Sequence, residues 1–299
     1  MKPAAGQSVV LGFPDYREPA RRLAGAAGIG YAEVALHTFP DGESLVRLPE
    51  ALPPHVVFCL TLTDANRRLV ELELATATAR RLGARRISLV APYLCYMRQD
   101  RAFHAGEAIS QRIIGQLLAR QVDALITVDP HLHRTRHLGD AVPLATASAV
   151  SAAPLMTAWL AARGCNSLLV GPDDESEQWV RRIADPGGFE YGIARKRRHG
   201  DREVEIELPD IDVGGRDIVI ADDVISTGHT VAVAAMQLAG RGARSISVLV
   251  THALFANGAA EQLRLAGVRE ICSTDSIPHP TNRLQLAGLL AQALAEPHA

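Results

Sequence analysis

The chain has 299 residues, of which 47% are hydrophobic and 21% charged, a composition typical of a folded globular protein. Lysine and arginine total 31 against 33 aspartate and glutamate residues, so the net charge of -2 gives no global attraction to nucleic acid or to an anionic membrane. Because domains usually contain about 100–200 residues, this length predicts two of them.

Short apolar runs alternate with segments whose apolar residues recur at helical spacing, and this alternation predicts an α/β fold with parallel sheets. In chain order, we expect strands at residues 55–62, 86–91, 124–128, 167–170, 189–193, 217–221 and 245–250. We expect helices at residues 69–82, 110–120, 149–163, 230–239 and 281–295.

Signals for a membrane or for secretion are weak. The longest nearly apolar stretch, residues 284–295, contains glutamine and is shorter than the ~20 residues of a membrane span. The apolar run near the N-terminus, residues 9–11, is too short for the core of a signal peptide. Four scattered cysteines form no Cys-x-x-Cys pair, which disfavours disulfides or structural zinc: Cys59, Cys95, Cys165 and Cys272. We therefore expect a cytoplasmic protein that binds neither membrane nor nucleic acid.

The chain contains an internal repeat. A shift of 159 residues places residues 83–90 over residues 242–249 with five identities in eight, and the expected strands and helices around them agree. This repeat predicts two copies of one α/β unit, in domains of residues 1–145 and 146–280. The remaining segment, residues 281–299, is expected to form a helix that packs back on the first domain.

The second copy contains a candidate phosphate site. An apolar strand is followed by Asp222 and Asp223 and then by the turn Ser-Thr-Gly-His-Thr at residues 226–230, which opens a helix. Such a turn directs backbone N–H groups and hydroxyls at an anion, and the two acids can hold ribose hydroxyls directly or through a metal. The alternative is an ordinary helix cap by Ser226 or Thr227. The first copy has Arg-Arg-Leu-Val-Glu at the corresponding place, residues 67–71, and so lacks the turn.

This segment resembles the ribose 5-phosphate loop of the phosphoribosyl pyrophosphate synthetases, also called ribose-phosphate diphosphokinases. Six further segments resemble that family in the family's order. They are the adenine-binding turn (residues 39–43), the Pro-Tyr…Arg-Gln-Asp segment (92–101), the Asp-x-His element (129–131), the Pro-Asp element (171–173), the mobile catalytic loop (196–198) and the segment at 251–255. The resemblance covers nearly the whole chain.

The resemblance implies two tandem phosphoribosyltransferase-like domains, each a mainly parallel sheet flanked by helices, with ATP bound on the first and ribose 5-phosphate on the second. It implies a homo-oligomer, dimeric or hexameric, that uses Mg²⁺ to transfer the diphosphoryl group of ATP to ribose 5-phosphate, releasing AMP. The residues it implies are as follows: Phe39, Asp41 and Glu43 for adenine; Arg98 and Gln99 for ATP; Lys196 and Arg198 for catalysis; Asp222, Asp223, Ser226, Thr227, Gly228, His229 and Thr230 for ribose 5-phosphate; His131 and Asp173 for the metal.

Two other functions remain open. Phosphoribosyltransferases share the loop of the second copy but do not need the first copy with its Phe-Pro-Asp-Gly-Glu turn. A non-catalytic homologue is the other alternative, favoured by the acidic residues 174–177, which replace the family's usual glycine-rich stretch. The segment after Asp100 lacks the basic stretch of phosphate-activated bacterial enzymes and looks more like archaeal members.

Two clusters also have plainer interpretations. The basic residues 195–199 can form a solvated face, although their place before the alternating segment 202–208 favours a hairpin arm in phosphoryl transfer. His131, His133 and His137 have the spacing of zinc ligands, but no matching acidic or cysteine partner set stands out. For His133 and His137 we expect solvent-facing polar positions.

Overall fold

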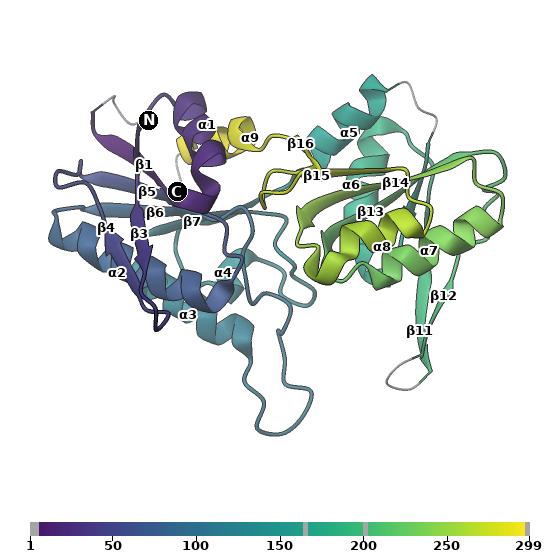
Figure 1. Ribbon diagram of the computed structural model, residues 1–299, viewed down its shortest axis with the longest axis horizontal. Helices are drawn as coiled ribbons and strands as arrows, with labels where there is room; N and C mark the ends of the chain where they lie inside the picture. Colours follow the sequence, from purple (N-terminus) through teal and green to yellow (C-terminus); the bar gives the residue numbers. More distant parts are fainter. Residues whose placement is uncertain (1–5, 164–166, 200–202, 297–299) are drawn as a thin grey trace. The chain divides into compact units, whose positions relative to one another are not determined.

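The computed structural model describes residues 6–163, 167–199 and 203–296 (Figure 1). These residues form two compact units. Unit 1 comprises residues up to Val150 together with Ser276–Pro278 and the chain from Gln285, whereas unit 2 comprises Ser151–Asp275 and His279–Leu284. Each unit contains a six-stranded parallel sheet flanked by helices, which confirms the predicted fold class.

In unit 1 the sheet has the order β2-β1-β5-β6-β7-β8. Its strands are β1 (Ser8–Gly12), β2 (Gly30–Glu33), β5 (His55–Cys59), β6 (Arg86–Val90), β7 (Ala124–Val128) and β8 (Ala147–Val150), and a separate hairpin consists of β3 (Ala35–Thr38) and β4 (Ser44–Arg47). The helices are η1 (Pro14–Tyr16), α1 (Arg17–Ala27), α2 (Ala65–Arg81), α3 (Ser110–Gln121), α4 (Leu138–Ala141) and α9 (Ala287–Ala295). Helix α1 packs on α9, and α2 packs on α3 (Figure 1).

In unit 2 the sheet has the order β10-β9-β13-β14-β15-β16. Its strands are β9 (Leu168–Gly171), β10 (Tyr191–Ile193), β13 (Asp217–Ile225), β14 (Ser245–Ala253), β15 (Glu270–Thr274) and β16 (Asn282–Leu284), and a separate hairpin consists of β11 (Arg195–His199) and β12 (Glu203–Glu207). The helices are α5 (Ala153–Ala162), η2 (Asp174–Ser176), α6 (Glu177–Gly187), α7 (His229–Gly240), η3 (Ala256–Gly258) and α8 (Ala259–Leu265). Helix α5 packs on α6, and α7 packs on α8.

The internal repeat is visible in the order of the strands. Strands β6 and β14 occupy the fourth place of their sheets and begin at Arg86 and Ser245, which the 159-residue shift superimposes. Both strands contain runs of consecutive buried residues, because helices cover both faces of a parallel sheet. The equivalence of these two strands, predicted from eight residues, is confirmed.

Several boundaries differ from the sequence predictions. Residues 149–163 are not one helix, because β8 extends to Val150 and α5 begins only at Ala153, with a proline in its first turn. The last helix begins at Ala287 rather than at residue 281, because Asn282–Leu284 pairs with β15 as an edge strand. Strand β13 continues past residue 221 to Ile225, so the two acids of the candidate site lie within the strand.

One glycine marks a close approach of α3 to α4. A Cβ atom added at Gly115 would lie 1.7 Å from the carbonyl oxygen of Ala141. Although alanine favours helix more than glycine does, we expect Gly115→Ala to lower the free energy of unfolding by about 1–3 kcal/mol, because the backbone of α4 must move. Gly25→Ala is the matched control: its added Cβ contacts nothing within 4 Å, and stability should rise by about 0.5–1 kcal/mol. Urea denaturation of both variants measures the difference, and equal effects would contradict the close approach.

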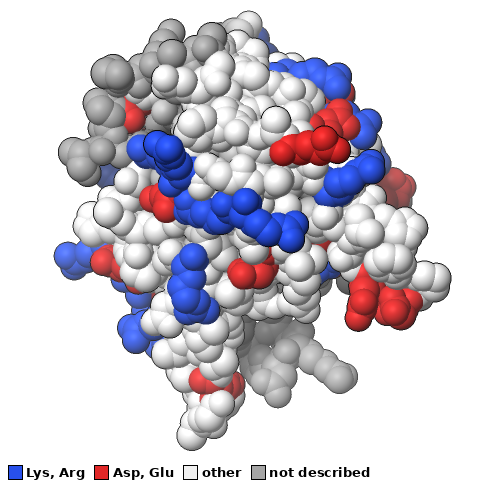
Figure 2. Space-filling model, turned by 90° about the vertical axis from the view of Figure 1, so that its left-hand side faces the viewer, with Lys and Arg blue, Asp and Glu red and all other residues white. Residues whose placement is uncertain are grey.

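Basic and acidic side chains are interspersed on the face of the protein drawn in Figure 2. Among the described residues, no helix is long and apolar enough to cross a membrane.

Candidate functional site

The carboxyl ends of two neighbouring strands in unit 2 carry a group of three acids. Strands β9 and β13 pair in parallel with Val170 opposite Ile220, so Asp173 and Asp222 follow at the same edge of the sheet. The backbone N–H of Asp223 donates to Asp222 Oδ1 at 2.9 Å. Burial, and then the charges of Asp223 and Asp173, hold the pKa of Asp222 well above its ordinary value. This edge of the sheet therefore favours binding of a cation.

Replacing Asp222 with asparagine is expected to stabilise the unliganded protein at neutral pH. A carboxyl whose pKa is raised by folding opposes folding at pH values above its ordinary pKa, because the folded state disfavours its charge. The melting temperature of Asp222→Asn should therefore exceed that of the wild type at pH 7. The difference should shrink as the pH falls toward the ordinary pKa of aspartate, where the wild-type carboxyl is protonated in both states. A lower melting temperature of the variant at pH 7 would contradict the repulsion among these acids.

Asp173 also has a structural role that the sequence did not reveal. Its side chain caps η2 by accepting the N–H groups of Glu175 at 3.1 Å and Ser176 at 3.2 Å. Residues 174–177, which stand where the family usually has a glycine-rich stretch, form η2 and the first residue of α6. Two amides that a glycine-rich loop would offer to an anion are thus paired with Asp173.

The turn after β13 presents the N-terminus of α7 without a side-chain cap. Gly228 is the N-cap residue, in the left-handed conformation at φ +73°, and no side-chain hydrogen bond caps this helix. The interpretation of Ser226 or Thr227 as a helix cap is therefore wrong. The first N–H groups of a helix have no partner within it, and the helix dipole makes that end positive. The turn thus has the donors of an anion site.

Neighbouring backbone fixes the shape of this turn. The carbonyl oxygens of Ile225 and Ser226 accept hydrogen bonds from Phe255 N at 3.1 Å and Ala256 N at 3.0 Å. Thr227 and His229 are exposed, whereas Ser226 and Thr230 are half-buried. The loop predicted for phosphate is therefore held from one side and open to solvent on the other.

The basic cluster lies in a two-stranded ribbon, as its alternating partner segment predicted. In the β11–β12 register, position 196 is opposite Ile206 and position 197 is opposite position 205. Ile206 is buried in the same apolar cluster as Val231 of α7. The side chains of Lys196 and Arg198 lie outside the part of the chain that the structure describes.

In unit 1 the predicted adenine-binding residues form the tip of the β3–β4 hairpin. Phe39 N donates to Glu43 O at 2.8 Å, and Gly42 N donates to Phe39 O at 2.9 Å. The side chain of Asp41 accepts the N–H of Glu43 at 3.1 Å. The ring of Phe39 is 40% exposed and meets the ring of His37 edge to face, with centroids 4.9 Å apart. This tip presents an aromatic surface beside two acids.

The other predicted ATP residues lie between β6 and α3 of the same unit. Arg98 is exposed, whereas Gln99 is half-buried and accepts a hydrogen bond from Ser110 Oγ at 2.6 Å. Asp100 forms an ion pair with Arg134 at 2.7 Å. The segment that precedes α3 is thus held by its own polar side chains, while the guanidinium of Arg98 remains accessible.

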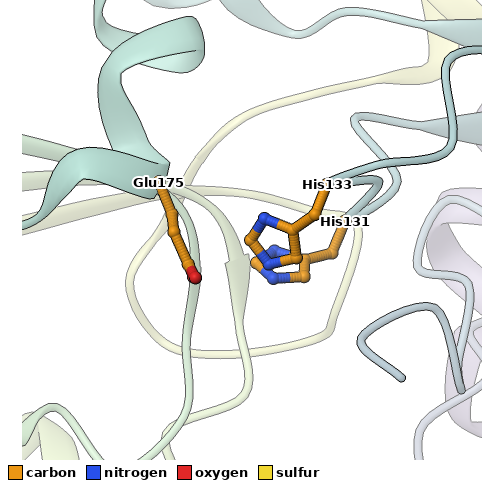
Figure 3. Close-up of side chains that lie close together, drawn as sticks. All are labelled: His131, His133 and Glu175. Carbon is orange, nitrogen blue, oxygen red and sulfur yellow. The ribbon is translucent and has the colours of Figure 1, made fainter. Parts of the chain in front are cut away.

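His131 follows β7 in unit 1, and its ring meets that of His133 edge to face, with centroids 4.2 Å apart (Figure 3). His137 instead begins α4, where its backbone N–H donates to Asp140 at 3.3 Å. Of the two histidines expected at solvent-facing positions, His137 is thus exposed, whereas His133 is half-buried against His131. The second predicted metal residue, Asp173, belongs to unit 2.

Sequence reasoning missed a buried ionic cluster at the start of α2. Arg68 and Glu71 are 3% and 1% exposed and form an ion pair with each other, and Arg68 also pairs with Asp15 at 2.6 Å. The shift that aligns the repeat places Arg68 over Thr227, so this cluster occupies the counterpart of the anion turn. The available signal was a pair of charged residues three positions apart at the start of the predicted helix, Arg68 just before it and Glu71 within it.

Comparison with known proteins places these features in a family. Residues 9–121 match the family described as the N-terminal domain of ribose phosphate pyrophosphokinase, and residues 207–291 match the phosphoribosyl synthetase-associated domain. A ribose-phosphate pyrophosphokinase of Methanopyrus kandleri is 36% identical, over 96% of this chain and 98% of the relative. Ribose-phosphate pyrophosphokinase 2 of Archaeoglobus fulgidus is 37% identical, over 91% of this chain and 95% of the relative.

A solved structure agrees in fold. The phosphoribosylpyrophosphate synthetase of Mycobacterium smegmatis superposes with a TM-score of 0.82 at 24% identity, over 96% of this chain and 97% of that one. The protein is thus a two-unit α/β protein with the synthetase fold. The chain belongs to the ribose-phosphate pyrophosphokinase family.

Proposed function

We propose that this protein synthesises 5-phosphoribosyl 1-pyrophosphate from ATP and ribose 5-phosphate. The C1 hydroxyl oxygen of ribose 5-phosphate bonds to the β-phosphorus of ATP, the bond between that phosphorus and the α–β bridging oxygen breaks, and AMP leaves. The hydroxyl proton passes to solvent. The observation that carries this proposal is the uncapped N-terminus of α7 beside paired acids, in a chain whose relatives bear that activity in their names.

The unit 2 residues are proposed to bind ribose 5-phosphate. The N–H groups at the start of α7 and the hydroxyls of Ser226, Thr227 and Thr230 would hold the 5-phosphate. Asp222 and Asp223 would accept hydrogen bonds from ribose hydroxyls. Lys196 and Arg198 would stabilise charge on the transferring phosphoryl oxygens, because phosphoryl transfer requires mainly positioning and electrostatic stabilisation from a protein.

The unit 1 residues are proposed to bind ATP. Phe39 would stack on adenine while Asp41 and Glu43 accept its donors, and Arg98 and Gln99 would contact the rest of the nucleotide. The exposure of the Phe39 ring and of Arg98 supports these roles. A homo-oligomer, in which a neighbouring copy supplies the adenine turn, is part of the same proposal.

Magnesium is the proposed cofactor, and the acids of unit 2 suit it. Mg²⁺ prefers oxygen ligands, and Asp173, Asp222 and Asp223 provide carboxylates whose mutual repulsion a divalent cation relieves. When bound, Mg²⁺ neutralises phosphate charge. In unit 1, His131 is proposed as a ligand of ATP-bound Mg²⁺, although a nitrogen ligand is less usual for magnesium.

The test is an incubation of the purified protein with ribose 5-phosphate, Mg²⁺ and ATP labelled at the β-phosphate. We expect equal amounts of AMP and labelled phosphoribosyl pyrophosphate. AMP with free labelled pyrophosphate would indicate hydrolysis and contradict the proposal. Absence of both products, in a protein that still binds ATP, would favour the non-catalytic homologue.

A further inference from the structure

The hairpin that carries the turn of residues 39–43 has few attachments to unit 1. Strands β3 and β4 form a separate two-stranded sheet, and such a sheet is marginally stable by itself. Leu36 and Val46, which are register partners, pack against the apolar core. Neither lies at the tip. The position of the tip therefore depends on contacts between unit 1 and hairpin residues nearer the tip than Leu36 and Val46.

Ser44 makes that contact. It begins β4 directly after Glu43, and its hydroxyl donates a hydrogen bond of 2.9 Å to Glu71 Oε1 on α2. Ser44 lies on the same side of β4 as Val46, which is the side that faces the core. A hydrogen bond thus links the residue next to the proposed adenine turn to helix α2 of unit 1.

Glu71 is itself held from its other oxygen. Its Oε2 pairs with Arg68, and Arg68 pairs in turn with Asp15 at 2.6 Å. Arg68 also lies over the ring of Phe13, with 5.9 Å between the guanidinium carbon and the ring centroid. Because Glu71 and Arg68 are almost fully buried, few rotamers are open to either side chain. The acceptor offered to Ser44 is therefore rigid.

We propose that Glu71 is a positioning residue for nucleotide binding, acting through Ser44 on the turn of residues 39–43. The inference rests on the proposed function, because it assigns this turn to ATP. The buried ion pair supplies a fixed anchor: Asp15 and Arg68 orient Glu71, Glu71 accepts the Ser44 hydroxyl, and the hairpin tip is held where Phe39, Asp41 and Glu43 meet the nucleotide. A buried ion pair adds little net stability compared with apolar residues of similar size. We therefore infer that the Arg68–Glu71 pair contributes mainly by fixing the position of the hairpin tip.

The test removes the link and leaves the ion pair intact. Substitution of Glu71 would strand the buried charge of Arg68 and threaten folding, so the variant is Ser44→Ala. The KM for ATP should rise roughly three- to tenfold, the range expected for loss of one hydrogen bond, with kcat and the KM for ribose 5-phosphate nearly unchanged. Ser44→Thr keeps the hydroxyl and should restore the wild-type KM. Thr38→Ala is the matched control, because Thr38 is the exposed register partner of Ser44 on β3 and should leave both KM values unchanged.

Equilibrium binding of a non-hydrolysable ATP analogue with Mg²⁺ is measured on the same proteins. Weaker binding by Ser44→Ala alone, restored in Ser44→Thr, supports the proposal. An unchanged affinity in Ser44→Ala, an equal loss for both substrates, or a threonine variant that behaves like the alanine variant would overturn it. If the wild type binds the analogue but forms no phosphoribosyl pyrophosphate, the proposed function is wrong, and the binding comparison still decides whether Ser44 and Glu71 position the turn.

Discussion

Replacing Lys196 with alanine is expected to lower kcat by about 100-fold or more, with little change in the KM for ribose 5-phosphate. A cation that engages the transferring phosphoryl group mainly in the transition state contributes to kcat rather than to ground-state binding. Loss of a comparable electrostatic stabiliser costs about 100- to 1,000-fold in other enzymes. Steady-state kinetics at saturating ATP and Mg²⁺ measures the effect.

Arg197→Ala is the matched control for Lys196→Ala. Positions 196 and 197 are adjacent in β11 and carry the same charge, but only position 196 is among the proposed catalytic residues. We expect Arg197→Ala to keep kcat within a few-fold of the wild type. An equal loss in both variants would mean that the cluster acts only through its summed charge, and an unchanged kcat in Lys196→Ala would refute the catalytic role.

Thr227→Ala is expected to raise the KM for ribose 5-phosphate by roughly ten- to a hundredfold and to leave the KM for ATP nearly unchanged. A hydrogen bond to a charged group is worth about 1.5–3 kcal/mol, which corresponds to that range of affinity. Because no side chain caps α7, the melting temperature should stay close to that of the wild type. Titration calorimetry with ribose 5-phosphate and a melting curve distinguish a binding role from a structural one. Normal affinity with a lowered melting temperature would mean that Thr227 contributes only to the stability of the fold.

Several buried strands were predictable because both faces of a parallel sheet are covered, which leaves uninterrupted apolar runs in the sequence. The five-residue strand β6 and its counterpart β14 are examples. The buried strands β1 and β15 were not predicted. Strands β3 and β4 were missed because they form a half-exposed pair outside the main sheet, and their apolar residues neither alternate with polar ones nor form a long run. Helix α1 was missed because alanine, glycine and charged residues supply most of it and obscure the apolar spacing.

In the candidate site, too, the features formed by residues adjacent in the chain were predicted, and those formed by tertiary contacts were not. Asp222, Asp223 and the turn of residues 226–230 are adjacent in the chain, so a motif of strand, acids and glycine-containing turn was enough to predict them. The end of β13 was misjudged because two aspartates disfavour a strand, and only pairing with β14 as far as Ala253 keeps them in it. The bond from Ser44 to Glu71 joins residues 27 positions apart and depends on tertiary packing, which no local pattern records.

The placement of α9 has a consequence for how the chain matures. This helix follows the last strand of unit 2, yet it belongs to unit 1, where it packs against α1 and buries Leu290 and Ala293. During synthesis, α1 therefore lacks this packing partner until all of unit 2 has been made. A fragment that stops at Val150 would leave the same surface of α1 open to aggregation.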